Sequence, residues 1–216
     1  MTTFRRIIIP GLLALSLLGT SASSAAAKTY HWNGLQIKMS QRNAKIFINR
    51  LSQTHWMFRK LVAKASRRSH VVVLVSGKNA PSGGNYTATR IDSQGTEFEI
   101  GLNPRNFKLG NKLGYHLEAH ELSHLVANSF VDTDVYATYF SVWNQSSSWN
   151  DCFPQKSPPA LAPCVGEDEI FADQIAFWAT GKSKVRSSYK LPPLASRSNM
   201  TRLVRSSGLW RNAGLR

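Results

Sequence analysis

The order of apolar and polar residues predicts one helix and three strands in the first half of the chain. After Ser40, a residue suited to cap a helix, apolar side chains recur at roughly helical spacing and predict one long helix over residues 40–65. The β-branched run HVVVLVSG, residues 70–77, is typical of a buried strand, and residues 78–85 predict a loop. The segments YTATRID and TEFEIGL alternate in character around SQG. They predict a hairpin whose second strand lies at a sheet edge.

The second half predicts helices with little strand. The run LGYHLEAHELSHLVAN, from about residue 113 to 128, has apolar residues on one face. Residues 167–181 begin with acids, which the helix dipole favours, and end in glycine. The run NMTRLVRSSGLW predicts a short amphipathic helix near the C-terminus. Together these elements predict an α+β domain with a small, mostly antiparallel sheet.

The first 27 residues have the pattern of a secretory signal peptide. Arg5 and Arg6 precede an apolar run of about 12 residues, and a stretch of small residues ends at Ala27. That run is too short to cross a bilayer, which takes about 20 helical residues, and no later run is long enough. We therefore expect a secreted or periplasmic protein with no transmembrane segment after cleavage; the alternative is an uncleaved amphipathic anchor. The expected parts are a signal peptide at 1–27, a main domain at 28–181 and a basic C-terminal extension at 182–216.

The two cysteines, Cys152 and Cys164, are close in sequence. In an exported protein such a pair most simply forms a disulfide. The rival interpretation, two thiolate metal ligands, has no CxxC spacing to support it.

Positive charge is concentrated at the C-terminus. The formal net charge of the chain is +15, and the segment from Gly181 to Arg216 has nine Lys or Arg and no acid. Such a segment attracts polyanions such as wall polymers, anionic lipid or nucleic acid. The alternative is a solvated tail without a partner. Neither interpretation sets the oligomeric state.

The stretch AHELSH indicates a metal site. Residues four apart lie one turn apart on the same face of a helix, so His120 and His124 can bind one cation. Glu121 lies about 100° around the helix, where its carboxylate can accept a proton from a metal-bound water. This HExxH arrangement is typical of zinc hydrolases, which need a third protein ligand and keep one position for water.

The third ligand is expected to be an acid, because no histidine follows His124. Helical geometry favours Glu169, which shares a face with Asp173 and with two small alanines that permit close helix packing. Asp173 is then expected to accept the ring N–H of a ligating histidine. The alternative for Glu169 is an acid that only stabilises the helix N-terminus. Candidates by position are Asp132, Asp134, Asp151, Glu167, Asp168, Glu169 and Asp173.

HELSH followed by EIFAD resembles the glutamate-zincin metallopeptidases, the group that includes thermolysin. The resemblance covers roughly residues 96–180. It implies a zincin-like fold, zinc ligands His120, His124 and Glu169, general base Glu121, and Asp173 as partner of a ligand histidine. It also implies that TEFEIGL is an edge strand that binds substrate.

Two features depart from that family. The connection from His124 to Glu169 is longer, and no downstream histidine is present to stabilise the oxyanion. Tyr136 and Tyr139 are the candidates for that role, with Tyr189 behind them.

His116 lies one turn before His120. The three histidines at 116, 120 and 124 span about 12 Å along the helix, too far for one zinc ion. His116 is therefore interpreted as a rim or packing residue.

The resulting hypothesis is a secreted zinc metallopeptidase that acts on a peptide or protein substrate. The alternative is a zinc-binding, catalytically weak or inactive cationic exported protein that binds anionic cell-envelope polymers.

Overall fold

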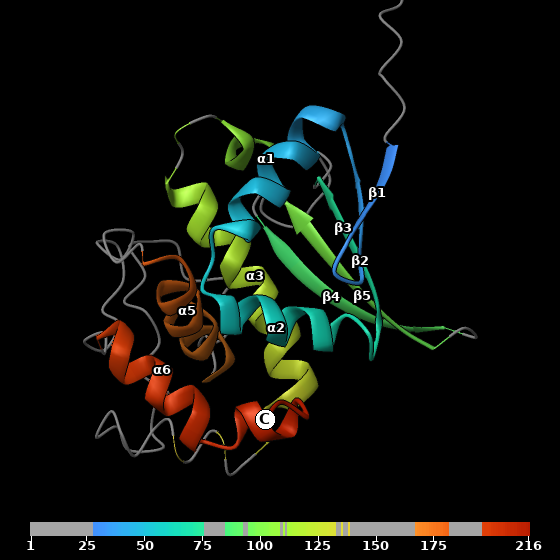
Figure 1. Cartoon of the computed structure of the whole chain (residues 1–216). Coiled ribbons are helices and arrows are strands. Elements are labelled where there is room, and N and C mark those ends of the chain that lie inside the picture. The colour runs from blue at the N-terminus through green and yellow to red at the C-terminus, as the bar shows by residue number, and fades with distance from the viewer. Residues whose placement is uncertain are drawn as a thin grey trace, which may run out of the picture.

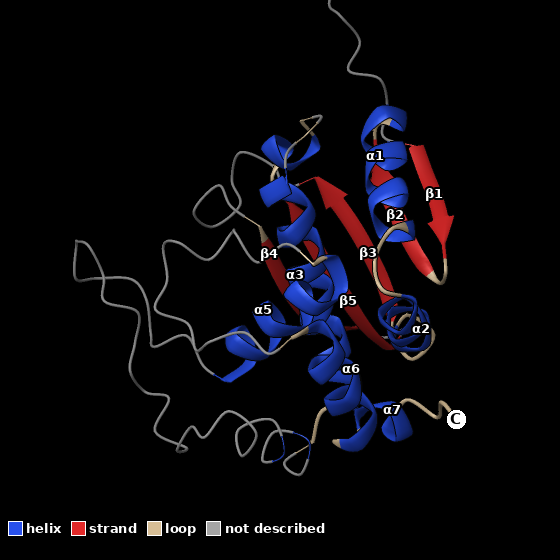
Figure 2. Cartoon of the chain, turned by 60° about the vertical axis from the view of Figure 1, so that its left-hand side comes forward, coloured by secondary structure: helices blue, strands red, loops and turns tan. Residues whose placement is uncertain are grey.

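A five-stranded mixed sheet and the helices packed on one of its faces form the domain (Figures 1 and 2). The computed structural model describes residues 28–75, 85–92, 95–108, 110, 112–132, 135, 138, 167–181 and 196–216. The strands are β1 (Lys28–Trp32), β2 (Leu35–Met39), β3 (His70–Val75), β4 (Tyr86–Asp92) and β5 (Gly95–Leu102). The helices are α1 (Gln41–Ser52), α2 (Trp56–Ala65), the 3-10 helix η2 (Pro104–Phe107), α3 (Lys112–Phe130), α5 (Glu167–Thr180), α6 (Arg197–Ser206) and α7 (Leu209–Asn212).

The N-terminal hairpin of β1 and β2 is an element that the sequence analysis misses. Asn33 and Gly34 have φ values of 47° and 91° and close a tight turn between the strands. Positive φ at both central residues is the geometry that Asn-Gly favours in hairpins. The signal was therefore present in the sequence, because Leu35, Ile37 and Met39 alternate behind that turn and are all buried.

The prediction of one helix over residues 40–65 is wrong, because the chain breaks it into α1 and α2. Ser40 does cap α1, as expected. At the break the backbone N–H of His55 donates to the carbonyl of Ala179 at 2.8 Å, and Arg59 donates to the carbonyl of Ser52 at 2.8 Å. The N–H of His55 and the carbonyl of Ser52, which a continuous helix would pair internally, thus bond to α5 and to the Arg59 side chain. The period of apolar residues carries no information about these partners.

The sheet has the strand order β1-β2-β3-β5-β4. The predicted hairpin of β4 and β5 is confirmed. Two expectations are corrected. The sheet is mixed, not mostly antiparallel, since β2–β3 and β3–β5 are parallel pairs. The strand β5 is not at the edge, because β3 and β4 flank it, and β4 is the edge strand.

The acids of β5 explain the mistaken edge assignment. Glu97 and Glu99 are partly exposed while Phe98 and Ile100 are buried. Alternation of this kind arises when one face of a sheet is covered and the other is not, whatever the position of the strand in the sheet. Figure 2 shows α1, α2 and α3 on one side of the sheet. Glu97 also pairs with His70 on the neighbouring strand, at 3.4 Å between Nδ1 and Oε2.

The C-terminal residues 196–216 pack into the same hydrophobic core as the rest of the domain. The predicted amphipathic helix is confirmed as α6, whose Met200 and Val204 are fully buried. Leu209 and Trp210 of α7 join the same cluster. The increase in positive charge after Gly181 therefore does not mark the end of the core.

Several predicted features lie outside the described residues. They are the signal peptide at 1–27, the cysteine pair Cys152 and Cys164, and the three tyrosines Tyr136, Tyr139 and Tyr189. Within the described ranges, none of the helices combines the length and the apolar character that a membrane span requires.

Candidate metal centre

Helix α3 brings two histidine rings to one point. The Nε2 atoms of His120 and His124 are 3.2 Å apart, and their rings meet edge to face at an interplanar angle of 83°. Two nitrogens bound to one tetrahedral zinc ion, with bonds of about 2.0–2.1 Å, lie about 3.3 Å apart. The two Nε2 atoms therefore already have the separation of a shared metal site, as the HExxH spacing predicts.

Glu121 follows the first of these histidines and is 7% exposed. Because it lies about 100° around the helix from its neighbour, its carboxylate is beside the pair rather than between the two rings. A largely buried carboxylate next to a metal-bound water is suited to general-base chemistry. The role of Glu121 as general base stays a prediction.

His116 is a buried residue hydrogen-bonded to α5, so of the two interpretations, rim or packing residue, the structure agrees with packing. Its Nε2 is 2.8 Å from Oδ1 of Asp173, and the two side chains are 2% and 14% exposed. When Nε2 carries the proton, it donates to the carboxylate, and Nδ1 becomes a lone-pair acceptor. Among the residues with described positions, that Nδ1 is buried without a hydrogen-bond partner.

The same contact gives Asp173 a histidine partner outside the HExxH motif. The sequence predicts that Asp173 accepts a hydrogen bond from a histidine of the HExxH motif. In the structure Asp173 forms a hydrogen bond with His116, one turn earlier on α3 than His120. Only packing of α5 against α3 creates this pair, although a sequence signal existed in the spacing of four between His116 and His120.

These contacts produce a second ligand set that can hold a metal ion. One ligand atom each from His116, His120 and Asp173 lies within 4.8 Å of the other two. Two imidazoles and a carboxylate suit several divalent transition metals, so the geometry does not fix the identity of the metal. His120 belongs to both this set and the HExxH pair, which makes it the centre of the candidate site.

Glu169 stands one helical turn before Asp173, about 6 Å along the axis of α5. Its backbone is part of the described helix, whereas its side chain lies outside the described positions. The predicted third ligand is therefore on the helix that meets the histidines of α3, on the same face as Asp173.

A buried ion pair, which the sequence analysis misses, fastens the metal-binding helix to α1. Arg50 Nη1 is 2.5 Å from Oε1 of Glu118, two residues before His120. The same guanidinium donates to the carbonyls of Asn106 at 2.7 Å and Lys108 at 3.0 Å. Burial raises the pKa of Glu118 to about 8, while the Arg50 charge opposes that rise. Arg50 thus connects α1, the η2 region and the part of α3 between His116 and His120.

No protein-family model, curated protein or solved structure matches this chain.

Proposed function

We propose that the chain is a zinc-dependent peptidase that binds its metal through His120, His124 and Glu169. The observation that carries the proposal is the 3.2 Å separation of the two histidine Nε2 atoms. The resemblance of HELSH and EIFAD to the glutamate-zincins supports the choice of zinc and of Glu169. Imidazole and carboxylate ligands with an open fourth position are the usual catalytic zinc set.

Each residue has a defined task in this proposal. A zinc ion held by His120, His124 and Glu169 would lower the pKa of a water ligand and polarise the substrate carbonyl. Glu121 accepts the proton of the attacking water and returns it to the leaving amine. His116 and Asp173, hydrogen-bonded to each other at 2.8 Å, hold α3 and α5 together beside His120.

The proposed substrate is an extended peptide that pairs with the edge of the sheet. Strand β4 is the last strand in the order β1-β2-β3-β5-β4 and pairs with β5 on one side. An edge strand presents backbone N–H and C=O groups to which an extended chain can add. The proposal therefore transfers to β4 the substrate-binding role that the sequence resemblance implies for β5.

The test is zinc content together with cleavage of a peptide library by the chain from Lys28 onward. Zinc at one ion per chain and chelator-sensitive cleavage are expected. Glu121→Gln should retain zinc and lower the cleavage rate by about 10² to 10⁴, because it removes the general base. Glu118→Gln is the matched control on the same helix and should keep activity. Full activity of the Glu121 variant would refute the mechanism, and zinc binding without cleavage would favour a binding protein.

The two ligand sets are separated by single substitutions. If the proposed set is right, His124→Ala and Glu169→Ala abolish zinc binding while His116→Ala retains it. The reverse pattern, in which His116→Ala and Asp173→Ala abolish binding, would assign the metal to the alternative set. His120→Ala should abolish binding in either case, which makes it the positive control.

A further inference from the structure

Two segments of the chain without acids fold against each other. Residues 28–75 and 174–216 contain no Asp or Glu. The first segment provides α2 and the second provides α6 and α7, which lie beneath α2 in Figure 1. The rings of Trp56 and Trp210 meet edge to face at 5.8 Å, and Arg68 Nη2 donates to the carbonyl of Asn212 at 3.1 Å. The fold thus brings α2 of the first segment against the C-terminal helices of the second.

Some of these cations have structural partners. The guanidinium groups of Arg59, Arg68 and Arg197 donate to the backbone carbonyls of Ser52, Ser129 and Trp178. Arginines in such positions stabilise the ends of helices and are not available to a partner.

A second group of cations is exposed and, across the described ranges, has no carboxylate partner. We call this group, together with Trp56, the basic face. Its cations lie on α2, α6 and α7 and beside them: Lys60, Arg67, Arg202, Arg205, Arg211 and Arg216.

The basic face carries an exposed indole. Trp56 is 43% exposed and is the one large apolar side chain exposed among the residues that the structure describes. Lys60 Nζ lies 5.0 Å from the centre of the Trp56 ring, and the edge-to-face contact with Trp210 holds the same ring in place. The pKa of the adjacent His55 is lowered, first by burial and then by the charges of Arg197, Arg59 and Arg205, so Arg197 and Arg205 of α6 lie close to the start of α2.

We propose that the basic face docks on the surface of an anionic phospholipid bilayer. Lys and Arg side chains are attracted to anionic headgroups. The indole of a tryptophan has an apolar body and a polar N–H, so it is suited to the headgroup region, where apolar and aqueous surroundings meet. Binding of a single-stranded nucleic acid would call for further exposed aromatic rings on which successive bases stack. The described part of the basic face presents only Trp56. This proposal is independent of the peptidase activity.

The test is co-sedimentation of the chain from Lys28 onward with lipid vesicles at 0.1 M salt. Binding is expected to phosphatidylcholine vesicles with about one third phosphatidylglycerol, and not to pure phosphatidylcholine. Arg205→Glu with Arg211→Glu should lower the partition coefficient by about 25-fold or more, since each basic residue near such a surface contributes a factor of about five.

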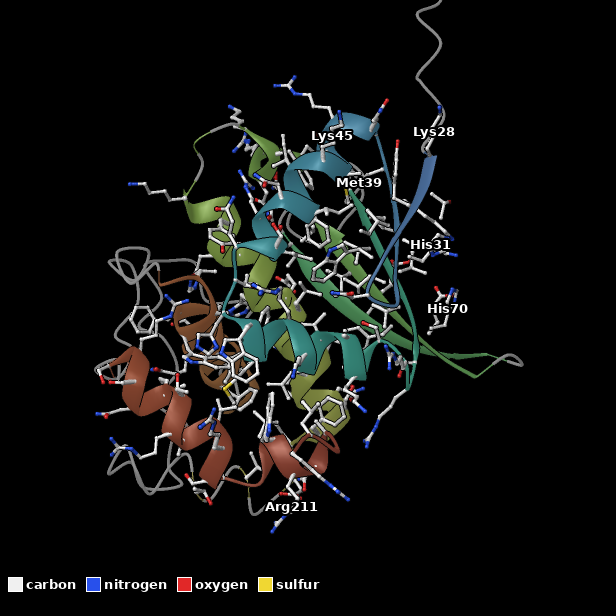
Figure 3. All side chains as sticks on the ribbon, in the orientation of Figure 1. Lys28, His31, Met39, Lys45, His70 and Arg211 are labelled. Carbon is white, nitrogen blue, oxygen red and sulfur yellow. The ribbon has the colours of Figure 1, made fainter. Side chains whose placement is uncertain are left out.

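A matched control with the same charge change is available on α1. Arg42 and Lys45 are exposed, and Figure 3 shows Lys45 at the opposite end of the molecule from Arg211. Arg42→Glu with Lys45→Glu should lower partitioning less than about three-fold, because salt screens charges at the far end of the molecule from the docked surface. Equal losses in the two double variants would show that net charge alone acts and would overturn the proposal.

Two further measurements distinguish the lipid surface from other polyanions and from misfolding. Trp56→Ala should lower vesicle partitioning about ten-fold while leaving retention on duplex DNA unchanged. Tighter binding to duplex DNA than to the anionic vesicles would overturn the choice of lipid. If the Arg205 and Arg211 variant fails to fold by circular dichroism, Lys60→Glu with Arg67→Glu tests the same face from α2, with the same 25-fold expectation.

Discussion

Glu118→Gln is expected to make the protein more stable than the wild type as the pH rises. The carboxylate of Glu118 is 1% exposed, and its Oε2 atom has no hydrogen-bond partner within the described structure. Its Oε1 atom has a single charged partner, Arg50, at 2.5 Å. Gln has nearly the shape of protonated Glu, so the substitution keeps an acceptor for Arg50 and removes the titration.

The sign follows from the difference between the folded and unfolded proteins. Burial raises the pKa of Glu118 from 4.5 to about 8 in the folded protein, with Arg50 opposing the rise. Between these two pH values the folded state binds a proton that the unfolded state has lost, so stability decreases as the pH rises. The free energy of unfolding falls by at most about 1.4 kcal/mol for each pH unit. Between pH 4.5 and pH 8 the total loss of stability is therefore at most about 4 to 5 kcal/mol.

The assay is urea unfolding, followed by tryptophan fluorescence, at pH 5 and pH 8 for both proteins. The free energies of unfolding should differ by less than about 1 kcal/mol at pH 5, with the variant the more stable at pH 8, by no more than about 4 to 5 kcal/mol. Glu99→Gln, on the partly exposed face of the sheet, is the control and should change stability by less than about 0.5 kcal/mol at either pH. A Glu118 variant that is less stable than the wild type at pH 8 would show that the ion pair outweighs burial, and would refute the reasoning.

Three further predictions concern packing and the metal. A Cβ atom at Gly114 would lie 2.5 Å from the Asn106 carbonyl oxygen, so Gly114→Ala should lower the stability by about 1–3 kcal/mol in thermal unfolding. Gly110→Asn is the control: a Cβ atom there meets no neighbour, and Asn tolerates a φ of 76°, so the free energy of unfolding should change by less than about 1 kcal/mol. Ending the chain at residue 195 should abolish the near-UV circular dichroism of the folded state, because α6 and α7 supply part of the core; a cooperative unfolding transition in the shortened chain would contradict this. Zinc at 100 times its dissociation constant should stabilise the wild type by about 2.7 kcal/mol, whereas His120→Ala should show no such gain, and chelator should reverse the effect.

The sequence by itself determined the features that depend on local spacing. The periods of apolar residues located α3, α5, the β4–β5 hairpin and the helix near the C-terminus. Four-residue spacing likewise placed His120 and His124 together, because residues four apart lie about one turn apart on the same face of an α-helix.

The tertiary structure decided which surfaces meet. The helix predicted over residues 40–65 breaks where His55 finds the carbonyl of Ala179, 124 residues later in the chain. Strand β5 lies inside the sheet because β3 pairs with it in parallel, although its alternation fits an edge strand equally well. Periodicity reports which face of an element is buried and does not report what buries it.

The candidate site shows the same division. HELSH identified one half of it from neighbouring residues, whereas the contact between His116 and Asp173 joins positions 57 residues apart. The Arg50–Glu118 pair spans 68 residues and was equally invisible in the pattern of charges. Long side chains can reach many partners, and only the packing of α1 and α5 on α3 selects the ones that they contact.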